Sequence, residues 1–439
     1  MDLSWCVFDL HPQIVYQFSA LPFALLFYFF TKLKCLSVIS RYIYLLLGGC
    51  VLATVTMGQY CLIVLTPAAT FVLLLLSVHP QHVHFWGFFV QMCWQTLWHL
   101  LIQYKEHWLQ ESIDNRLLVA ISSLMLLTQR VTSLSMDIQE GKLQSLQTKA
   151  QSSVRYNFPL WIPYLSYTLF FPALLGGPLC SFSYFRSFVE QNGLSSIPFP
   201  LGAVLQKTLL VLSLEGAKTF LRCHLSSNSL SQAHFNVLEG ILFIWGISLL
   251  YKLSYYSHWT LSESLNNAAG LGFRGYNKHG NPLWDALSDG NILTLETLTR
   301  LSHFARMWNK TTAEWLRRLV FQKCHVSPLL LTFGFSAWWH GLHPGQLVGF
   351  LCWAATVEAD YRIHHYLSPY MDSKVKRLIY KVLTWFQTQL VIACIVVIIE
   401  LRYLSSVWLL FKAYIGLFPL LNCLVLVVLP RKQQIKVLY

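Results

Sequence analysis

Long apolar stretches alternate with short polar connections along almost the whole chain. Most of the stretches approach the ~20 residues that a helix needs to cross about 30 Å of hydrocarbon. They lie at residues 14–31, 42–56, 60–78, 83–103, 117–135, 161–180, 202–221, 235–256, 328–342, 345–360, 382–401 and 406–429. We find no internal repeat among them. The pattern predicts an all-α polytopic membrane protein, with residues 1–439 forming a single integral-membrane domain.

One of these stretches is interrupted by helix-breaking residues. Residues 161–180 contain Pro163, Pro172, Gly176 and Pro178. Proline removes a backbone donor and disturbs the preceding helical turn. Non-helical backbone at membrane depth is tolerated only where it is buried in protein or lines a water-filled cavity. We therefore predict that 161–180 is a re-entrant segment and that the protein encloses an intramembrane cavity.

The basic residues indicate an orientation in the membrane. Lysine and arginine are dense in the connections 300–323 and 362–381, whereas 1–13 contains none. The positive-inside rule places the basic connections and the C-terminus in the cytosol and the N-terminus in the lumen. Because the two termini lie on opposite sides of the membrane, the chain must cross it an odd number of times. Twelve apolar stretches with one of them re-entrant give about eleven transmembrane helices.

The composition supports the membrane class and excludes an ordinary soluble domain. Of the 439 residues, 55% are hydrophobic and 12% are charged, whereas soluble domains carry about 25% charged residues. The net charge of +13 is therefore better explained by topology and lipid headgroups than by a nucleic-acid partner. The scattered cysteines show no metal-ligand spacing, and no metal site is predicted.

A histidine lies inside the apolar stretch "PLLLTFGFSAWWHGLHPG". If a helix begins near Pro328, twelve residues place His340 about 18 Å along it. A buried histidine that only satisfies its hydrogen bonds is the ordinary alternative. Within a membrane, however, an ionisable residue is a functional candidate by default. Desolvation favours the neutral imidazole, which can accept a proton.

A basic segment, "RMWNKTTAEWLRRLVFQ", precedes this stretch at 306–322. It is typical of an amphipathic helix on the cytosolic leaflet. Its arginines, Arg306, Arg317 and Arg318, can also bind the phosphates of a co-substrate. Asn309 begins the glycosylation sequon Asn309-Lys310-Thr311. A glycan requires a lumenal loop, and the charge pattern places this segment in the cytosol, so we predict that Asn309 carries none.

These motifs resemble the membrane-bound O-acyltransferase family over essentially the whole chain. The strings that carry the resemblance are "YTLFFPALLGGP" (167–178), "YYSHWTLSESLNNAAGLGFRGYN" (255–277), "WNKTTAEWLRRLVFQ" (308–322) and "FSAWWHGLHPGQ" (335–346). The resemblance implies an acyltransferase fold around an intramembrane cavity, with His340 and Asn309 as the catalytic residues.

The resemblance also implies a reaction. It is the transfer of octanoyl from octanoyl-CoA, a co-substrate and not a resident cofactor, to a serine hydroxyl near the N-terminus of the peptide ghrelin. The implied compartment is the endoplasmic reticulum membrane. Within the family, a lysophospholipid or another secreted protein is the alternative acceptor. A transporter or channel is the alternative from another class, and it predicts repeats and paired charges that we do not find.

Two groups of residues are predicted to bind the substrates. Trp308 and the three arginines of the basic segment would receive CoA. Phe333 and Trp353 would set the length of the acyl chain. Phe333 lies seven residues before His340, on the same face of a helix, and the break at Gly341–Gly345 lets the next helix return with Trp353. Ordinary core packing remains the alternative for both aromatics.

Overall fold

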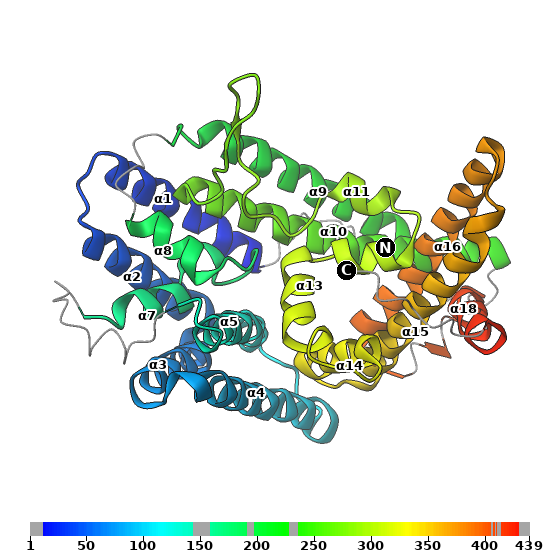
Figure 1. Cartoon of the computed structure of the whole chain (residues 1–439), viewed down its shortest axis with the longest axis horizontal. Coiled ribbons are helices and arrows are strands. Elements are labelled where there is room, and N and C mark those ends of the chain that lie inside the picture. The colour runs from blue at the N-terminus through cyan, green and yellow to red at the C-terminus, as the bar shows by residue number, and fades with distance from the viewer. Residues whose placement is uncertain are drawn as a thin grey trace. The chain divides into compact units, whose positions relative to one another are not determined.

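The computed structural model describes residues 12–143, 159–190, 197–227, 236–404, 407–408, 410 and 414–429. These residues are mainly helical (Figure 1). The strands among them are β1 (Gly275–Tyr276) and β2 (Pro282–Leu283), which pair antiparallel with Gly275 opposite Leu283. The prediction of an all-α fold is confirmed.

The helices divide into two compact units. The first unit comprises the described residues of 8–216 and 255–289, and the second unit comprises those of 217–254 and 290–439. The first unit contains α1 (Pro12–Lys32), α2 (Val38–Met57), α3 (Leu62–Ser77), α4 (Pro80–Tyr104), α5 (Asn115–Gln139), α7 (Ile162–Thr168) and α8 (Phe182–Glu190). The second unit contains α11 (Ile292–Thr297), α12 (Leu301–Met307), α13 (Lys310–Leu316), α14 (Pro328–His340), α15 (Pro344–Leu367), α16 (Lys374–Leu401) and α18 (Leu417–Val428). Helices α9 (Leu201–Ser227) and α10 (Val237–Ala269) contribute to both units. That the whole chain acts as one domain stays a prediction.

Several helical stretches are long and apolar enough to cross a membrane. Among the described residues they are Ile14–Lys32, Val38–Ser77, Asn115–Gln139, Val237–Ala269 and Lys374–Leu401. The stretch Val38–Ser77 holds α2 and α3, joined by a 3-10 turn at Gly58–Cys61. The chain is therefore a multi-pass membrane protein. The number of about eleven crossings stays a prediction.

The segment predicted to be re-entrant is broken in the structure. Helix α7 has seven residues and is followed by a single 3-10 turn, Phe171–Ala173, so neither spans the bilayer. The buried guanidinium of Arg130, on α5, donates to the carbonyl of Thr168 at 3.0 Å and to that of Ala173. Carbonyl groups freed from helical hydrogen bonding are thereby satisfied. The break confirms the sequence reading, and re-entry itself stays a prediction.

Helix α14 begins at Pro328, as predicted, and ends at His340. Gly341 has φ of 118°, a left-handed conformation that favours glycine. The Gly341 N–H donates to Trp338 O at 3.1 Å, and the Leu342 N–H donates to Ala337 O at 3.0 Å. These bonds satisfy the last carbonyls of the helix, as in a Schellman motif. Pro344 then begins α15 at a position that needs no backbone donor.

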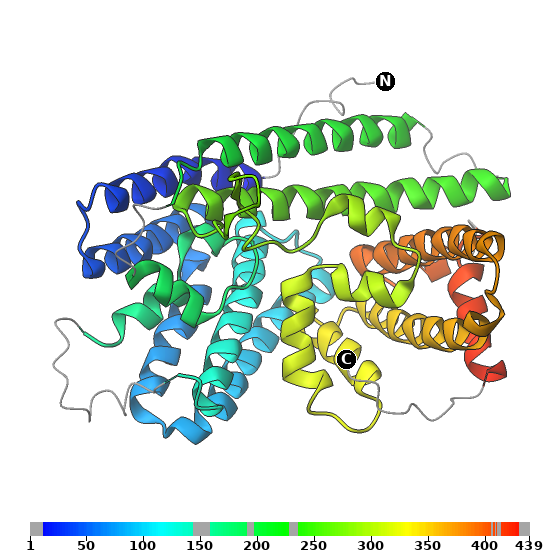
Figure 2. The same ribbon diagram turned by 45° about the horizontal axis from the view of Figure 1, so that its top comes forward.

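Helices α15 and α16, drawn in gold to orange in Figure 2, belong to the second unit, and two glycines of α15 lie very close to α16 and its end. A Cβ at Gly345 would lie 2.6 Å from the backbone carbon of Arg402, and one at Gly349 would lie 2.5 Å from the side chain of Ile399. The Gly345 N–H donates to Arg402 O at 2.7 Å. This small-xxx-small spacing allows membrane helices to pack backbone to backbone. It fixes α15 firmly against α16.

Candidate active site

His340 occupies the C-terminal end of α14 and is half-buried among aromatic rings. Its imidazole stacks on Phe350 with 5.0 Å between centroids and an interplanar angle of 28°. The ring of Trp339 meets it edge-on at 4.7 Å. His343, three residues later, is 4% exposed and precedes α15. The imidazole of His340 therefore lies directly beside the break between α14 and α15.

Asn309 lies between α12 and α13 in an unusual conformation. Its φ of 47° and ψ of 62° are left-handed, a region that asparagine adopts more readily than other residues with a side chain. The half-buried side chain makes no capping hydrogen bond to α13. Residues in sparsely populated conformations cluster at functional sites. The Asn309 amide therefore lies at the turn before α13 without serving as its cap.

A series of ring contacts links the His340 segment to the Asn309 segment. We call His340, Phe350, Trp353, Phe304 and Trp308 the aromatic cluster. Along it, centroid separations are 5.0 Å from His340 to Phe350, 6.3 Å from Phe350 to Trp353, 6.3 Å from Trp353 to Phe304 and 5.4 Å from Phe304 to Trp308. The last ring precedes the left-handed asparagine in sequence. The fold thus connects two segments that the sequence separates by some thirty residues.

Phe333 lies against the same cluster. Its ring is 5.4 Å from that of Trp353, with an interplanar angle of 39°. Helix α15 returns beside α14 after the break and brings the two aromatics together, as the sequence analysis expected. The indole N–H of Trp353 is buried and has no hydrogen-bond partner among the described residues. The role of the pair in setting acyl length stays a prediction.

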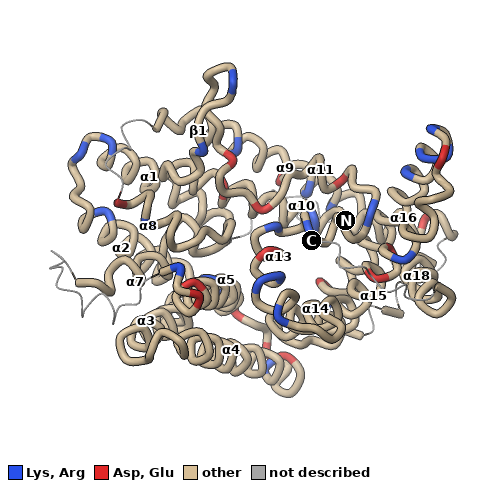
Figure 3. The backbone as a smooth tube through the Cα atoms, in the orientation of Figure 1, with Lys and Arg blue, Asp and Glu red and all other residues tan. Residues whose placement is uncertain are grey.

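The arginines of the basic segment flank α13 in the second unit, and Figure 3 marks the Lys and Arg positions of this region in blue. Arg306 is exposed, and its Nε donates to Ser302 O at 3.2 Å. Arg317 is exposed and begins the π-helical turn Arg317–Phe321, and Arg318 is half-buried. Burial, together with Arg300 and Arg306, lowers the pKa of His303. Phosphate binding by these arginines stays a prediction.

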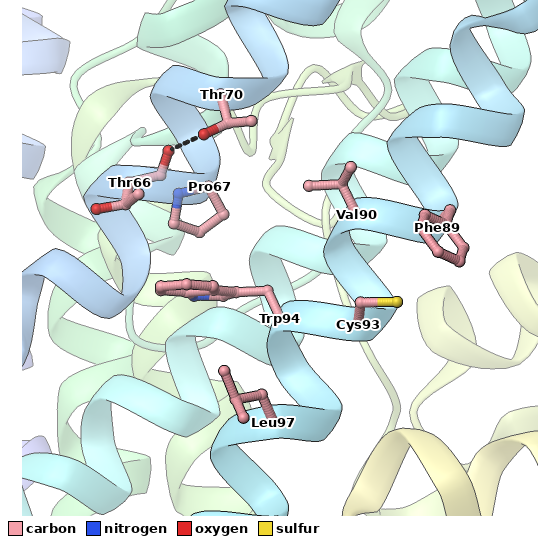
Figure 4. A pocket seen from close by; sticks show the side chains of 8 residues that line it. All are labelled: Thr66, Pro67, Thr70, Phe89, Val90, Cys93, Trp94 and Leu97. Carbon is pink, nitrogen blue, oxygen red and sulfur yellow. Dashed lines mark hydrogen bonds between the residues drawn. The ribbon is translucent and has the colours of Figure 1, made fainter.

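A groove of about 340 Å³ lies on the first unit, between α3 and α4 (Figure 4). Pro67, Phe89, Val90, Trp94 and Leu97 make most of its lining apolar. Thr66, Thr70 and Cys93 complete the lining. Because none of the predicted site residues is among them, this groove is not the predicted catalytic cavity. The existence of that cavity stays a prediction.

The sequence analysis missed a buried ion pair in the second unit. Lys252, on α10, is 1% exposed, and its Nζ lies 2.9 and 2.8 Å from the two carboxylate oxygens of Glu296 on α11. Gln389, on α16, donates to Glu296 O at 3.1 Å. A lysine inside the apolar run 235–256 was the available signal. In the described parts of the chain, no group of three His, Cys, Asp or Glu residues could hold a metal ion.

Known proteins resemble this chain over most of its length. A model of the membrane-bound O-acyltransferase family matches residues 71–399. Membrane-bound ghrelin O-acyltransferase of Rattus norvegicus is 45% identical over 429 residues, covering 97% of this chain and 98% of that protein. The Mus musculus protein of the same name is 46% identical over 435 residues, covering 98% and 99%. Membrane-bound glycerophospholipid O-acyltransferase 1 of Homo sapiens is 30% identical over 392 residues, covering 82% and 77%. This chain is an acyltransferase and belongs to the membrane-bound O-acyltransferase family.

Proposed function

We propose that this enzyme transfers octanoyl from octanoyl-CoA to a serine hydroxyl near the N-terminus of ghrelin. The relatives named for ghrelin acylation match at 45% and 46% identity over nearly the whole chain, whereas the glycerophospholipid enzyme matches at 30% over a smaller share. The observation that carries the catalytic assignment is the aromatic cluster, which joins the His340 and Asn309 segments.

In this proposal His340 acts as the general base. It accepts the proton of the serine hydroxyl while the oxygen attacks the thioester carbonyl. The carbon–sulfur bond then breaks, and the CoA thiolate leaves with the proton that the imidazole returns. The stacked ring of Phe350 and the edge of Trp339 orient the imidazole and limit the access of water. General-base assistance of this kind contributes about 10²–10⁴-fold to the rate.

Asn309 stabilises the charge that develops on the carbonyl oxygen. Its amide is not used as a cap for α13 and can therefore donate to an oxyanion. A preorganised donor acts most strongly where it does not have to reorganise during the reaction. Asn309→Ala should lower kcat by about 10²–10³-fold, and Asn309→Gln should recover little because the longer side chain displaces the donor.

The basic segment binds the CoA part of the donor. Its phosphates require several cations, and a guanidinium binds phosphate through two parallel hydrogen bonds. Arg306 lies in the last turn of α12, two residues before Trp308 and three before Asn309, so it can join CoA binding to the reacting centre. Arg306→Glu should raise the KM for octanoyl-CoA more than the KM for the peptide. Equal effects on both constants would indicate a lipid anchor instead.

The two substrates approach from opposite sides of the endoplasmic reticulum membrane. Acyl-CoA is cytosolic and a secreted peptide is lumenal, so the reaction requires a passage through the protein. An N-terminus in the lumen and a C-terminus in the cytosol follow from the basic connections. The broken segments after Thr168 and His340 support the presence of such a passage, because irregular backbone at membrane depth needs protein or water around it.

Microsomes that contain the enzyme, labelled octanoyl-CoA and a ghrelin N-terminal peptide test the proposal. Transfer of label to the peptide, and its loss when alanine replaces the acceptor serine, are expected. His340→Ala should abolish transfer in protein that still folds, whereas His343→Ala should have the milder effect. Label that enters lysophospholipid but no peptide would favour the alternative acceptor. Normal turnover by His340→Ala would overturn the general-base assignment.

A further inference from the structure

A carboxylate from α15 supports the helix that leads to Asn309. Helix α12 begins after Arg300, whose side chain makes no capping hydrogen bond and has no acceptor atom. Asp360 supplies the missing acceptor. Its Oδ2 accepts from the backbone N–H of Ser302 at 3.2 Å and from Arg300 Nη2 at 3.2 Å. The side chains of Asp360 and Arg300 are 11% and 16% exposed.

Helix α12 depends on such support because it is short. It has seven residues, and isolated helices of that length are not stable in water. Two of the contacts that hold it to α15 are the hydrogen bond from Ser302 to the Asp360 carboxylate at its first turn and the packing of Phe304 against Trp353 at 6.3 Å. Phe350, Trp353 and Asp360 are spaced three and seven residues apart and therefore lie on one face of α15. That face touches His340 at one end and α12 at the other.

We propose that Asp360 is a positioning residue, which holds α12 so that Arg306 and Asn309 keep their places relative to His340. The inference rests on the function proposed above. Without the carboxylate, the Ser302 N–H and the Arg300 guanidinium lose their shared acceptor, and only packing contacts such as that of Phe304 hold α12 to α15. Arg306 at its last turn and the asparagine beyond it then move together. The loss therefore weakens the binding of acyl-CoA and lowers kcat, although Asp360 touches neither substrate.

The same helix offers a matched control. Glu358 pairs with Arg362, with 3.2 Å between Oε1 and Nη2, and these side chains are 22% and 18% exposed. Arg362 Nη1 donates to the carbonyls of Leu426 and Leu429 at the end of α18. Glu358→Gln therefore removes a half-buried ion pair two residues from Asp360 that faces α18. Any general weakening of α15 should appear in both variants.

The test combines two measurements on the full-length enzyme in detergent. Hydrogen exchange reports the backbone amides of 302–308, and kinetics report kcat and the KM for octanoyl-CoA and for the peptide. Asp360→Ala should speed exchange in 302–308 by about tenfold or more, since a hydrogen bond to a charged group is lost. It should also raise the KM for octanoyl-CoA and lower kcat, while the KM for the peptide stays within about twofold. Asp360→Asn keeps an acceptor for Ser302 and should recover part of each effect.

Glu358→Gln should leave exchange in 302–308 and both KM values unchanged, whatever its effect on thermal stability. Unchanged exchange in Asp360→Ala, or the same changes in Glu358→Gln, would overturn the positioning role. If Asp360→Ala does not fold, the comparison of Asp360→Asn with Glu358→Gln decides by the same criteria. A wild-type enzyme that transfers no octanoyl to the peptide would refute the proposed function. The exchange measurement would still decide how α12 is held.

Discussion

Two helices of the chain end in a break, and the two breaks are stabilised in different ways. We call the break after His340 the first break and the break after Thr168 the second break. At the first break, residues next to it in sequence satisfy the free carbonyls of the helix end. Gly341 adopts the left-handed conformation, and the N–H groups of Gly341 and Leu342 cap α14. At the second break, the carbonyl of Thr168 is satisfied by Arg130, 38 residues earlier on α5. The first break is a local structure, and the second depends on a distant side chain.

The surroundings of the two breaks differ as well. Phe170, Phe182 and Phe185 are at most 1% exposed and pack around the second break as an ordinary core. The rings beside the first break include a half-buried imidazole. We infer that the second break is a structural element of the fold and that the first break belongs to the catalytic centre. The predictions below test this division.

The largest effect is expected at the second break. Arg130→Ala leaves two buried carbonyls without a donor, and each costs about 1–3 kcal/mol. The free energy of unfolding should fall by about 2–6 kcal/mol, which a thermal midpoint in detergent would detect. Arg116→Ala is the matched control, because Arg116 is exposed on the same helix, and it should change stability by less than about 0.5 kcal/mol. Equal midpoints for the two variants would remove the distinction between the breaks.

The next effect is expected at the first break. Gly341→Ala places a side chain in a left-handed conformation, at a cost of about 1–2 kcal/mol. The end of α14 should shift, and kcat should fall more than the KM values change. Gly334→Ala is the control, since a Cβ there meets nothing within 4 Å, and alanine favours the helix by about 0.5–1 kcal/mol. A Gly341→Ala enzyme with normal kcat would show that the left-handed turn is not needed to place His340.

The aromatics near the first break should determine acyl length. Shortening either Phe333 or Trp353 to alanine should shift the preference from octanoyl towards decanoyl or longer donors. Each added methylene that becomes buried contributes about 0.8 kcal/mol, or about fourfold in kcat/KM. Phe185→Leu, which alters a buried ring at the second break, should lower stability and leave the preference unchanged. Equal loss of activity with every donor in Phe333→Ala and Trp353→Ala would make both residues part of the core.

The smallest effect concerns pH. Burial, Arg300 and Arg306 lower the pKa of His303 from its usual 6.5, against an opposing effect of Asp360. The unfolded chain therefore binds this proton more readily than the folded chain, and stability should fall as the pH drops below about 6.5. His303→Gln should remove that part of the decline, as measured by thermal midpoints between pH 7.5 and 5.5. The same decline in both proteins would assign it to other groups.

The sequence predicted where the helices break better than it predicted which distant side chains stabilise the structure around each break. Pro328 and Gly341 delimit α14 because proline favours a first turn and glycine favours a left-handed end, so the place of His340 at the helix end could be predicted. The prolines of 161–180 likewise marked the second break. Arg130 and Asp360 could not be assigned, since their partners lie far away in sequence and only the packed fold brings them together. The ring of Phe350 on His340 was missed for the same reason.

The close contact between α15 and α16 has a consequence for natural variation. Any missense change at Gly345 or Gly349 adds at least a Cβ, which would lie within 2.6 Å of atoms that are already present. At Gly345 the obstructing atoms belong to the backbone of α16 and its end, and they cannot rotate away. In a saturation screen, Gly345 should therefore tolerate no replacement, alanine and serine included, whereas Gly349 should tolerate alanine better because the side chain of Ile399 can shift. An allele that changes Gly345 should be inherited as a loss of function although the residue touches no substrate.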